Sequence, residues 1–453
     1  MFLALKTPLL RHGLLLACAC APACSSYQPL PLQEGQPARL EVDTRSLPFP
    51  PMAAHRFDPD DGLDIVEVAM LAVVNNPELR LVRDDAAIAQ AQSFSAGLLP
   101  DPQLSFSGDL SNSGGAGATT AFGAGLSYDI ASLLTHGAQH RATENDAAKT
   151  DLTLLWQEWQ VAAQAQLLFV KVVQGRKQMA VLHDTRQVFA DRYARTRRAL
   201  DGALVNSDAV APNLAALQDV DRQLFDLTKL QNQSTHELNA LLGLAPGTVL
   251  ALRPDSDAGA VDAALAGAAL VDLARRRPDL RALQAAYQAE DQRYRGALLA
   301  QFPALTLGFT RARDSSNVYS SGIGVTMSLP FLNRNRGNIA IGQASRQKAY
   351  DEYQVRVQAA RNDVRRILDE QALNLAQAAR LDADLRDLAG VLARSDRALR
   401  AGDADVVAYT LARSALLARQ LERLALEQAV LEQRVGLRTV LGIDMTNLES
   451  VKP

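Results

Sequence analysis

Two pairs of short segments alternate apolar and polar residues, and a very long helical pattern follows each pair. In the clearer pair, Leu305, Leu307 and Phe309 alternate with Thr and Gly, and the stretch 321–330 alternates in the same way. A period of two is expected for strands that place one face in an apolar medium and the other in water. Strands of about ten residues also suit a tilted crossing of a bilayer, but any antiparallel sheet with one wet face gives a similar pattern. The pattern predicts strands at about 304–312 and 321–330.

The chain contains the same unit twice. The segment PELR at 77–80 matches PDLR at 278–281, and the same register aligns Pro102 with Pro303 and the LGL that starts at Leu242 with a later LGI. The offset of roughly 200 residues is far longer than a solenoid repeat, so it indicates a duplicated half-molecule. Each half reads as helix, strand, loop, strand, long helix, turn and long helix. The first half places its strands at about 103–110 and 121–130.

The helical patterns after the strands are unusually long. No proline occurs from Gly137 to Leu200 or from Gly342 to Leu399. Such stretches of about 60 residues would form helices on the order of 90 Å long. On the last two helices, leucines recur at alternating steps of four and three residues, which is typical of coiled-coil seams. The seams alone fit a soluble antiparallel bundle equally well.

The sequence divides into six expected parts. We expect a lipoprotein-type signal peptide, an extended Pro-rich periplasmic strap, a first repeat, a linker, a second repeat and a short tail. In the same order, their expected bounds are 1–23, 24–60, 61–247, 248–267, 268–445 and 446–453. The strap is expected to lie along the surface and not to build a core, because prolines favour an extended chain.

All cysteines of the chain lie near its start. Two basic residues precede a short apolar stretch that ends in Cys24, which is followed by two serines. This arrangement indicates a secretory signal peptide of the lipoprotein type. Cys24 is the expected site of lipidation, including palmitate, because it leaves an apolar stretch of normal length. Cys18 is the alternative, and ordinary cleavage without lipid also fits. Apart from such a covalent lipid, no cofactor is expected.

Composition narrows the function further. The 453 residues carry a net charge of -3, so a nucleic-acid partner is not expected. No apolar run reaches the roughly 18 residues of a membrane-spanning helix. No nucleophile motif, phosphate-binding loop or metal-ligand cluster is present, so the chain is not expected to be an enzyme.

Four strands are too few for a membrane barrel. An open sheet edge cannot lie in lipid, so identical chains must combine their strands. Three copies would supply 12 strands, enough for a barrel with a lumen. The expected fold is therefore mainly α with a small transmembrane β part, in which a trimeric 12-strand barrel continues into a long α-helical barrel. This would be a conduit across the outer membrane and into the periplasm.

Several stretches carry a family resemblance. The repeated NNPELR and RRPDLR, AGLLPDPQLSF and ALLAQFPALTLGF, and the later MSLPFLNRNRGNIA resemble the TolC-type outer-membrane efflux channels. The resemblance covers 61–445. It implies a homotrimer that docks with a periplasmic adaptor and an inner-membrane pump of the resistance-nodulation-division class, within outer-membrane lipid. The stretch NRNRGN resembles the heavy-metal branch of that family. Passive export of metal cations or drugs is the implied activity.

The turns between the long helices hold the candidate pore residues. Asp208, Asp403 and Asp405 lie there, and in a threefold assembly each would form a ring that favours cations. The alternative for each is helix capping, because aspartate is favoured at turns and helix starts. The family's acidic gate residue has no counterpart near Thr410, so Tyr409 is a further candidate for the constriction.

Other polar clusters have simpler interpretations. His136 and His140 have the spacing of a metal-binding pair, and Glu144 continues the same face, but a wet helix start is favoured and no metal site is expected. The triplet 275–277 of arginines is expected at a solvated or adaptor-facing helix end. The alternative to a channel is a periplasmic coiled-coil scaffold or adaptor, in which the strand pairs are small soluble hairpins.

Overall fold

A computed structural model describes residues 27–32, 40–110, 119–401 and 406–443. The chain divides into two units, Met1–Pro37 and Ala38–Pro453. In the first unit, residues 27–32 have no regular secondary structure and are exposed. The expected signal peptide, both candidate cysteines, Asp403, Asp405 and the tail lie outside the described residues. The structure described below is that of the second unit.

The second unit contains the duplicated order of helices and strands that the repeat predicts. The first repeat consists of α3 (Ile65–Asn75), α4 (Pro77–Gly97), β1 (Gln103–Asp109), β2 (Ala121–Asp129), α5 (Ile130–Asp201) and α6 (Ser207–Leu241). The second consists of α7 (Ala263–Val271), α8 (Leu273–Arg276), α9 (Pro278–Leu299), β3 (Leu305–Arg313), β4 (Tyr319–Met327), α10 (Arg336–Ala401) and α11 (Val406–Leu441). The expected fold class, mainly helical with two strand pairs, is confirmed. The strand β4 starts two residues earlier than expected and ends three residues earlier.

Local signals set the helix boundaries at the start of each repeat. Asp64 accepts hydrogen bonds from the N–H groups of Val66 and Glu67, and the Glu67 carboxylate accepts one from the N–H of Asp64. This capping box starts α3. The helix ends before Pro77, because proline cannot continue an i to i-4 ladder. In the second repeat, α7 already begins at Ala263, inside the stretch expected as a linker.

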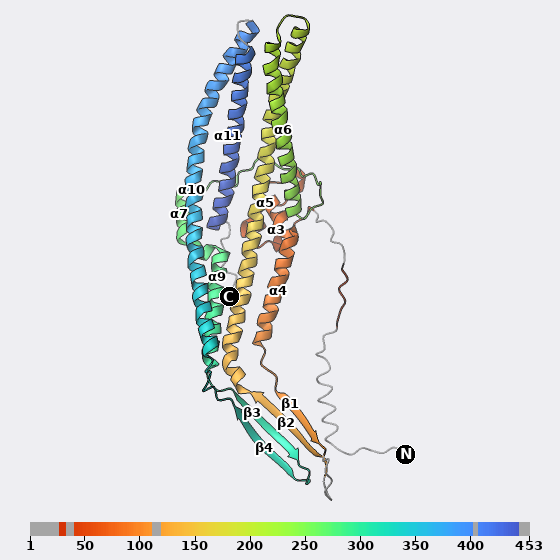
Figure 1. Ribbon diagram of the computed structural model, residues 1–453, viewed down its shortest axis with the longest axis vertical. Coiled ribbons are helices and arrows are strands. Elements are labelled where there is room, and N and C mark those ends of the chain that lie inside the picture. The colour runs from red at the N-terminus through yellow and green to blue at the C-terminus, as the bar shows by residue number, and fades with distance from the viewer. Residues whose placement is uncertain (1–26, 33–39, 111–118, 402–405, 444–453) are drawn as a thin grey trace, which may run out of the picture. The chain divides into compact units, whose positions relative to one another are not determined.

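The two long helices follow the strands almost directly. The helix α5 has 72 residues and α10 has 66, so they are about 108 Å and 99 Å long at the usual rise. The sequence predicted a start near Gly137, but α5 begins at Ile130. The Asp129 carboxylate caps this earlier start by accepting hydrogen bonds from the N–H groups of Ala131 and Ser132. Figure 1 shows the strands at one end of these helices and the turns to α6 and α11 at the other.

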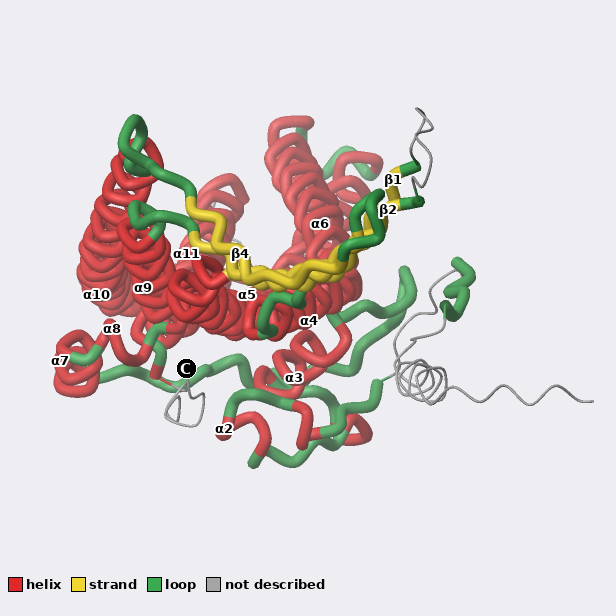
Figure 2. The backbone as a smooth tube through the Cα atoms, turned by 90° about the horizontal axis from the view of Figure 1, so that it is seen from below, coloured by secondary structure: helices red, strands yellow, loops and turns green. Residues whose placement is uncertain are grey.

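The strands form one antiparallel sheet in the order β1-β2-β3-β4. The central pair joins the two repeats, because β2 pairs with β3, for example Leu126 with Phe309. The strands β1 and β4 are the two edges. Figure 2 shows that the sheet is curved and that α2, α3, α7 and α8 lie on one side of the row of long helices.

Part of the expected strap does build a core. The short helices η2 (Thr44–Ser46), α2 (Pro50–Ala53) and η3 (Pro59–Asp61) interrupt it. Leu47, Phe49 and Met52 are buried against α3 and α5, and the Phe49 ring lies 5.0 Å from the ring of Trp159. The expectation of a strap without core contacts is therefore wrong for this stretch. The prolines shape the path of the chain, but the apolar residues between them decide its burial.

Each repeat has its own main core where its short helices meet its long ones. The first core joins α3, α5, the end of α6 and part of α11, and the second joins α7 to α11. In the second core Arg277 is only 2% exposed, and both ends of its guanidinium donate to the Asp279 carboxylate at 2.9 and 2.7 Å. The expectation of a solvated arginine triplet is wrong for Arg277. It is buried because Asp279 and the ring of Trp156, 4.7 Å from its guanidinium carbon, satisfy its charge.

Candidate channel wall and tip

The sheet has one apolar face and one face of small polar residues. Residues paired across an antiparallel sheet lie on the same face, so the register assigns every side chain. One face carries Leu104, Phe106, Gly108, Phe122, Ala124, Leu126, Tyr128, Leu305, Leu307, Phe309, Arg311, Arg313, Tyr319, Ser321, Ile323, Val325 and Met327. We call it the apolar face. Its large side chains are exposed, with Ile323 at 82% and Phe106 at 76%, so the protomer leaves this face uncovered.

The opposite face, here the small-residue face, is built from Gly, Ser and Thr. An added Cβ at Gly123 would lie 2.7 Å from the Ser107 hydroxyl oxygen, and one at Gly125 would lie 2.7 Å from that of Ser105. A larger residue at either glycine would therefore require the serine side chain opposite it to move. Compact side chains let a sheet curl over this face, which is what a narrow barrel needs on its inner side. Asp109 and Asp129 add its only charges among the described strands.

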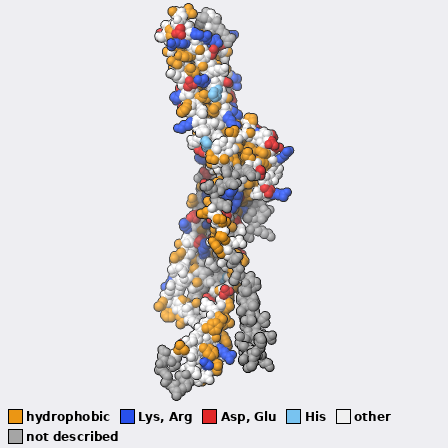
Figure 3. Space-filling model, turned by 90° about the vertical axis from the view of Figure 1, so that its right-hand side faces the viewer, with side chains coloured by type: hydrophobic (Ala, Val, Ile, Leu, Met, Phe, Trp, Pro, Cys, Tyr) orange, Lys and Arg blue, Asp and Glu red, His pale blue; other side chains and the backbone are white. Residues whose placement is uncertain are grey.

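Figure 3 shows apolar side chains at the strand end of the molecule and also along the helices. Beyond the strands, Phe302, Leu329, Phe331 and Leu332 continue the exposed apolar surface toward the helices. At the far end of the sheet, the rings of Phe122 and Tyr319 meet edge to face, 6.3 Å apart. An apolar band that ends in aromatic rings is the pattern of a barrel wall in lipid. Within the described residues, no helix is both long and apolar enough to cross a membrane.

The two hairpins of long helices meet close to their turns. The Arg192 guanidinium on α5 donates to the Asp396 carboxylate on α10 at 2.9 Å and lies 3.6 Å from the ring centre of Tyr409 on α11. Nearby, the Thr410 hydroxyl donates to the side-chain oxygen of Asn213 at 3.1 Å, and both residues are buried. Both sets of contacts connect the first repeat with the second, and the Arg192 contacts border a cleft of about 1000 Å³.

Of the candidate pore residues, the structure describes Asp208 and Tyr409, and their surroundings differ. Asp208 is exposed in the first turn of α6, where its charge suits the helix N-terminus, and its carboxylate accepts from the Asn206 side-chain amide at 3.4 Å. Asn206 occupies the cap position but makes no side-chain capping bond. Tyr409 is only 5% exposed and packs inside the protomer under Arg192. The sequence had not identified Arg192, Asp396 or Asn213. Their positions on long periodic helices gave no signal of which helices would meet.

The histidine pair lies at the start of α5. The rings of His136 and His140 are nearly parallel with centres 6.1 Å apart, and His140 Nδ1 lies 3.6 Å from a Glu144 carboxylate oxygen. An added Cβ at Gly97 on α4 would lie 2.7 Å from His140 Nε2, so this nitrogen packs against the neighbouring helix. Among the residues that the structure describes, no group of three or more His, Cys, Asp or Glu side chains could hold a metal ion.

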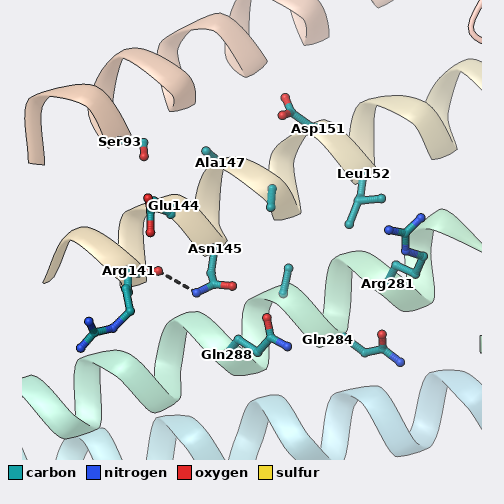
Figure 4. Close-up of a pocket in the computed structure, with 12 residues that line it drawn as sticks. Ser93, Arg141, Glu144, Asn145, Ala147, Asp151, Leu152, Arg281, Gln284 and Gln288 are labelled. Carbon is teal, nitrogen blue, oxygen red and sulfur yellow. Dashed lines mark hydrogen bonds between the residues drawn. The ribbon is translucent and has the colours of Figure 1, made fainter. Parts of the chain in front are cut away.

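A polar crevice of about 560 Å³ lies between α4, α5 and α9. Figure 4 shows Glu144 and Asp151 on α5, Ser93 on α4, and Arg281 with two glutamines on α9. Burial raises the pKa of Asp151, although the Gln90 amide, which donates to it at 3.3 Å, partly offsets this. Both signs of charge alternate along the crevice, so it favours neither a cation nor an anion. We interpret it as a packing gap between α4, α5 and α9.

Comparison with known proteins agrees with this geometry. The family model described as "Outer membrane efflux protein" matches residues 269–443. No curated protein sequence matches the chain. Solved structures with a similar fold include CusC, at 19% identity and a TM-score of 0.72 over 89% of this chain and 99% of that chain. Another is the Campylobacter jejuni CmeC outer membrane channel, at 16% identity and a TM-score of 0.70 over 92% and 95% of the two chains. A third is the open state of the Neisseria gonorrhoeae MtrE channel, at 17% identity and a TM-score of 0.71 over 91% of this chain and 97% of that chain.

The family match lies in the second repeat, and the fold match extends over both. The solved outer membrane channels align with 89% to 92% of this chain, which includes parts of both repeats. Residues 269–443 therefore match the outer membrane efflux protein family model, and the fold of both repeats is similar to that of solved outer membrane channels.

Proposed function

We propose that three copies of this chain close their sheets edge to edge into one barrel, which continues as a tunnel of long helices. The observation that carries the proposal is the sheet itself. It has a fully exposed apolar face and two unpaired edges, β1 and β4. Unpaired backbone groups cannot lie in lipid, so β4 of one copy must pair with β1 of the next. Channels of this family are homotrimers of tripartite pumps, which agrees with the strand count.

The helices also offer lateral contact surfaces. Exposed apolar side chains lie on α4 at one border of the protomer and on α10 at the other. They include Leu81 and Phe94 on α4, and Ile341, Val355 and Leu373 on α10, each more than half exposed. Long apolar rows on helices that lack a neighbour usually mark contacts with another chain. A trimer would cover them and continue the closure of the barrel along the tunnel wall.

The conduit works passively and makes or breaks no bond. We expect an inner-membrane pump of the resistance-nodulation-division class to supply metal cations or drugs, and a periplasmic adaptor to connect the pump to the helical tip. A cargo ion would pass through without a resident site. The scaffold alternative leaves the exposed face of β1 to β4 without a purpose, since a soluble hairpin would not keep its large apolar side chains in water.

The experiment for the channel combines conductance with edge pairing. The purified trimer should migrate as a heat-modifiable species in detergent and conduct ions in planar bilayers. Variants with one cysteine at Ser105 on β1 and a second cysteine on β4 should crosslink neighbouring copies into trimers. The control variant has its cysteines at Ser105 and at Thr310 on the inner strand β3, and it should not crosslink copies. A monomer that dissolves without detergent and does not conduct would overturn the proposal.

The membrane attachment is a separate proposal. Cys24 would carry the lipid, because it follows an apolar stretch of signal-peptide length, with Cys18 as the alternative. One acyl chain holds a protein weakly and several hold it firmly, so a lipidated terminus would support insertion of the barrel. Replacement of Cys24 by Ala should abolish labelling with palmitate. Labelling lost only on replacement of Cys18 would move the site.

The tip is the proposed constriction. In a trimer Asp208 would form an acidic ring, with Asp403 and Asp405 in the neighbouring turn and Tyr409 behind it. Asp208 is exposed, as a pore residue must be. Neutralising it should lower the preference for cations, measured as a shift in reversal potential under a salt gradient. An unchanged preference would leave helix stabilisation as its role.

A further inference from the structure

The apolar face of the sheet carries two arginines and no acidic residue among its described positions. Arg311 and Arg313 lie on β3, in register with Phe106 on β1 and with Phe122 on β2, respectively. The acidic residues of the strands, Asp109 and Asp129, lie on the opposite face. A charge on a face that meets lipid is most unfavourable at the membrane centre, so the depth of the two arginines matters.

The arginines lie at one end of the strands. Counting along β3 from Leu305 at the helix end, Arg311 and Arg313 are six and eight residues further, which is roughly 20 and 27 Å along the strand. The helices extend into the periplasm, so the far end of the sheet belongs to the outer leaflet. A charge there is close to the interface, where an arginine on a barrel surface costs little.

The guanidinium group of Arg313 is held in place by its neighbours, and no described acidic side chain neutralises it. The guanidinium carbon of Arg313 lies 4.9 Å from the ring centre of Phe122, and its NH2 group donates to the carbonyl of Thr120 at 2.8 Å. Its Nε is buried and has no hydrogen-bond partner among the described residues. Arg311 is exposed, and no described acidic side chain pairs with either arginine.

The neighbouring turns do not supply the missing negative charge. Asp314 follows Arg313 directly, but its carboxylate accepts hydrogen bonds from the N–H groups of Ser316 and Val318 within the turn. The sequence of the other hairpin turn, 111–118, contains no acidic residue. The strand β3 pairs with β2 and β4 inside the protomer, so the two arginines do not lie at a sheet edge where another copy would cover them.

We propose that Arg311 and Arg313 bind the phosphate group of an anionic lipid in the outer leaflet, whose acyl chains lie against the apolar face. The proposal rests on the function proposed above, because it needs this face to point outward. Two guanidinium groups present planar sets of donors that match phosphate oxygens. The exposed Phe309 and Ile323 lie next to them toward the helices, where the acyl chains would run. A free phosphate would use only the arginines, whereas a lipid would use both features.

The test measures lipid retention by the full-length trimer. It is reconstituted in phosphatidylcholine nanodiscs that contain a minor fraction of lipid A, a phosphorylated acyl lipid. After a detergent wash, mass spectrometry gives the lipid A retained per trimer. The double variant Arg311→Gln, Arg313→Gln should retain at least about fivefold less, because two charge-assisted contacts are lost. The matched control Arg334→Gln, at the helix end of the sheet, should retain as much as the wild type.

Two further arms identify what is bound. Dephosphorylated lipid A should be retained equally by the wild type and the double variant, and excess inorganic phosphate should not displace lipid A from the wild type. Displacement would mean that the site takes a free anion, and it would overturn the lipid proposal. If the double variant fails to form a heat-modifiable trimer, Arg311→Lys replaces it. This variant keeps the charge and loses the planar donor set, so it should show a smaller loss of retention.

The channel and the lipid site can fail separately. All variants should conduct in planar bilayers as the wild type does, because neither arginine lies on the small-residue face. Normal conductance with unchanged lipid A retention in the double variant would overturn the lipid proposal alone. If the wild type neither inserts into bilayers nor conducts ions, the channel proposal is overturned.

Discussion

The two repeats solve the same structural problem with different chemistry. In the first, the Asn76 side-chain amide donates to the carbonyl of Leu241 at the end of α6, 3.0 Å away. In the second, Arg277 occupies the matching position, and its guanidinium donates to the carbonyl of Val440 at the end of α11, 3.3 Å away. In the first repeat the contact joins the end of α6 to the start of α4, and in the second it joins the end of α11 to the start of α9. The duplication has preserved the bond and changed the residue.

The difference shows what a buried charge requires. Asn76 is neutral, and its oxygen also caps α4 by accepting from the N–H of Leu79. Arg277 cannot cap α9, and its charge needs the Asp279 carboxylate, which also accepts from Arg356 at 2.8 Å. Burial alone would raise the pKa of Asp279, but these two arginines outweigh it and lower the pKa. The arginine version therefore needs a network, whereas the asparagine version is complete alone.

The largest effect is expected from Arg277→Ala. It removes a buried cation, opens a void beside Trp156 and leaves Asp279 with Arg356 alone. Breaking a buried ion pair costs about 3 to 5 kcal/mol. The trimer should lose heat resistance in detergent, measured as the midpoint of the gel-mobility change. Arg275→Ala, in the adjoining helical turn, is the control and should change the midpoint little. If Arg277→Ala and Arg275→Ala lower the midpoint equally, the buried ion pair of Arg277 does not stabilise the protein.

A smaller effect is expected from Asn76→Ala. It removes a helix cap and one hydrogen bond to Leu241, which together contribute about 1 to 3 kcal/mol. The reciprocal change Arg277→Asn sharpens the comparison, because the new side chain could cap α9. It should cost less than Arg277→Ala in the same heat-resistance assay. If it costs as much, capping has no compensating value in the second repeat.

The smallest effect is a dependence on pH. Because the pKa of Asp279 is below its ordinary value of 3.8, its contribution to stability is full above about pH 4 and is lost as the pH falls through its folded-state pKa. The stability difference between the wild type and Asp279→Asn should therefore shrink in acid. It is measured as the heat-resistance midpoint from pH 6 downward. A difference that stays constant with pH would exclude an ionised Asp279 as the source.

The sequence predicted most of the architecture because the elements are long and strongly periodic. The duplication, both strand pairs and the long helices after them followed from local patterns. What it missed depended on partners distant in the chain. The burial of Arg277 required Asp279 to be joined by Trp156 and Arg356, and the burial of Phe49 required Trp159. A run of three arginines reads as solvated unless these partners are known.

The candidate site divides in the same way. The alternation of the strands, continued along β3, places both arginines on the apolar face, but only the pairing of β2 with β3 showed that Phe122 lies beside Arg313. At the tip, the acidic residues were visible as sequence, whereas the contact of Arg192 with Asp396 and Tyr409 depends on how two hairpins of uniform appearance approach each other. The sequence of a long helix shows its periodicity clearly, but it does not show which other helix it will pack against.

The pairing of β2 with β3 also sets an order of events during biogenesis. The earlier hairpin cannot complete its inner border until the later one has been synthesised and exported, because the matching strand lies beyond the whole of α5 and α6. A lone two-stranded hairpin is marginally stable, and joining segments so distant in the chain is slow. Until then the polypeptide exposes unpaired backbone hydrogen-bonding groups and is prone to aggregation. A periplasmic chaperone that shields it should therefore be needed for efficient assembly.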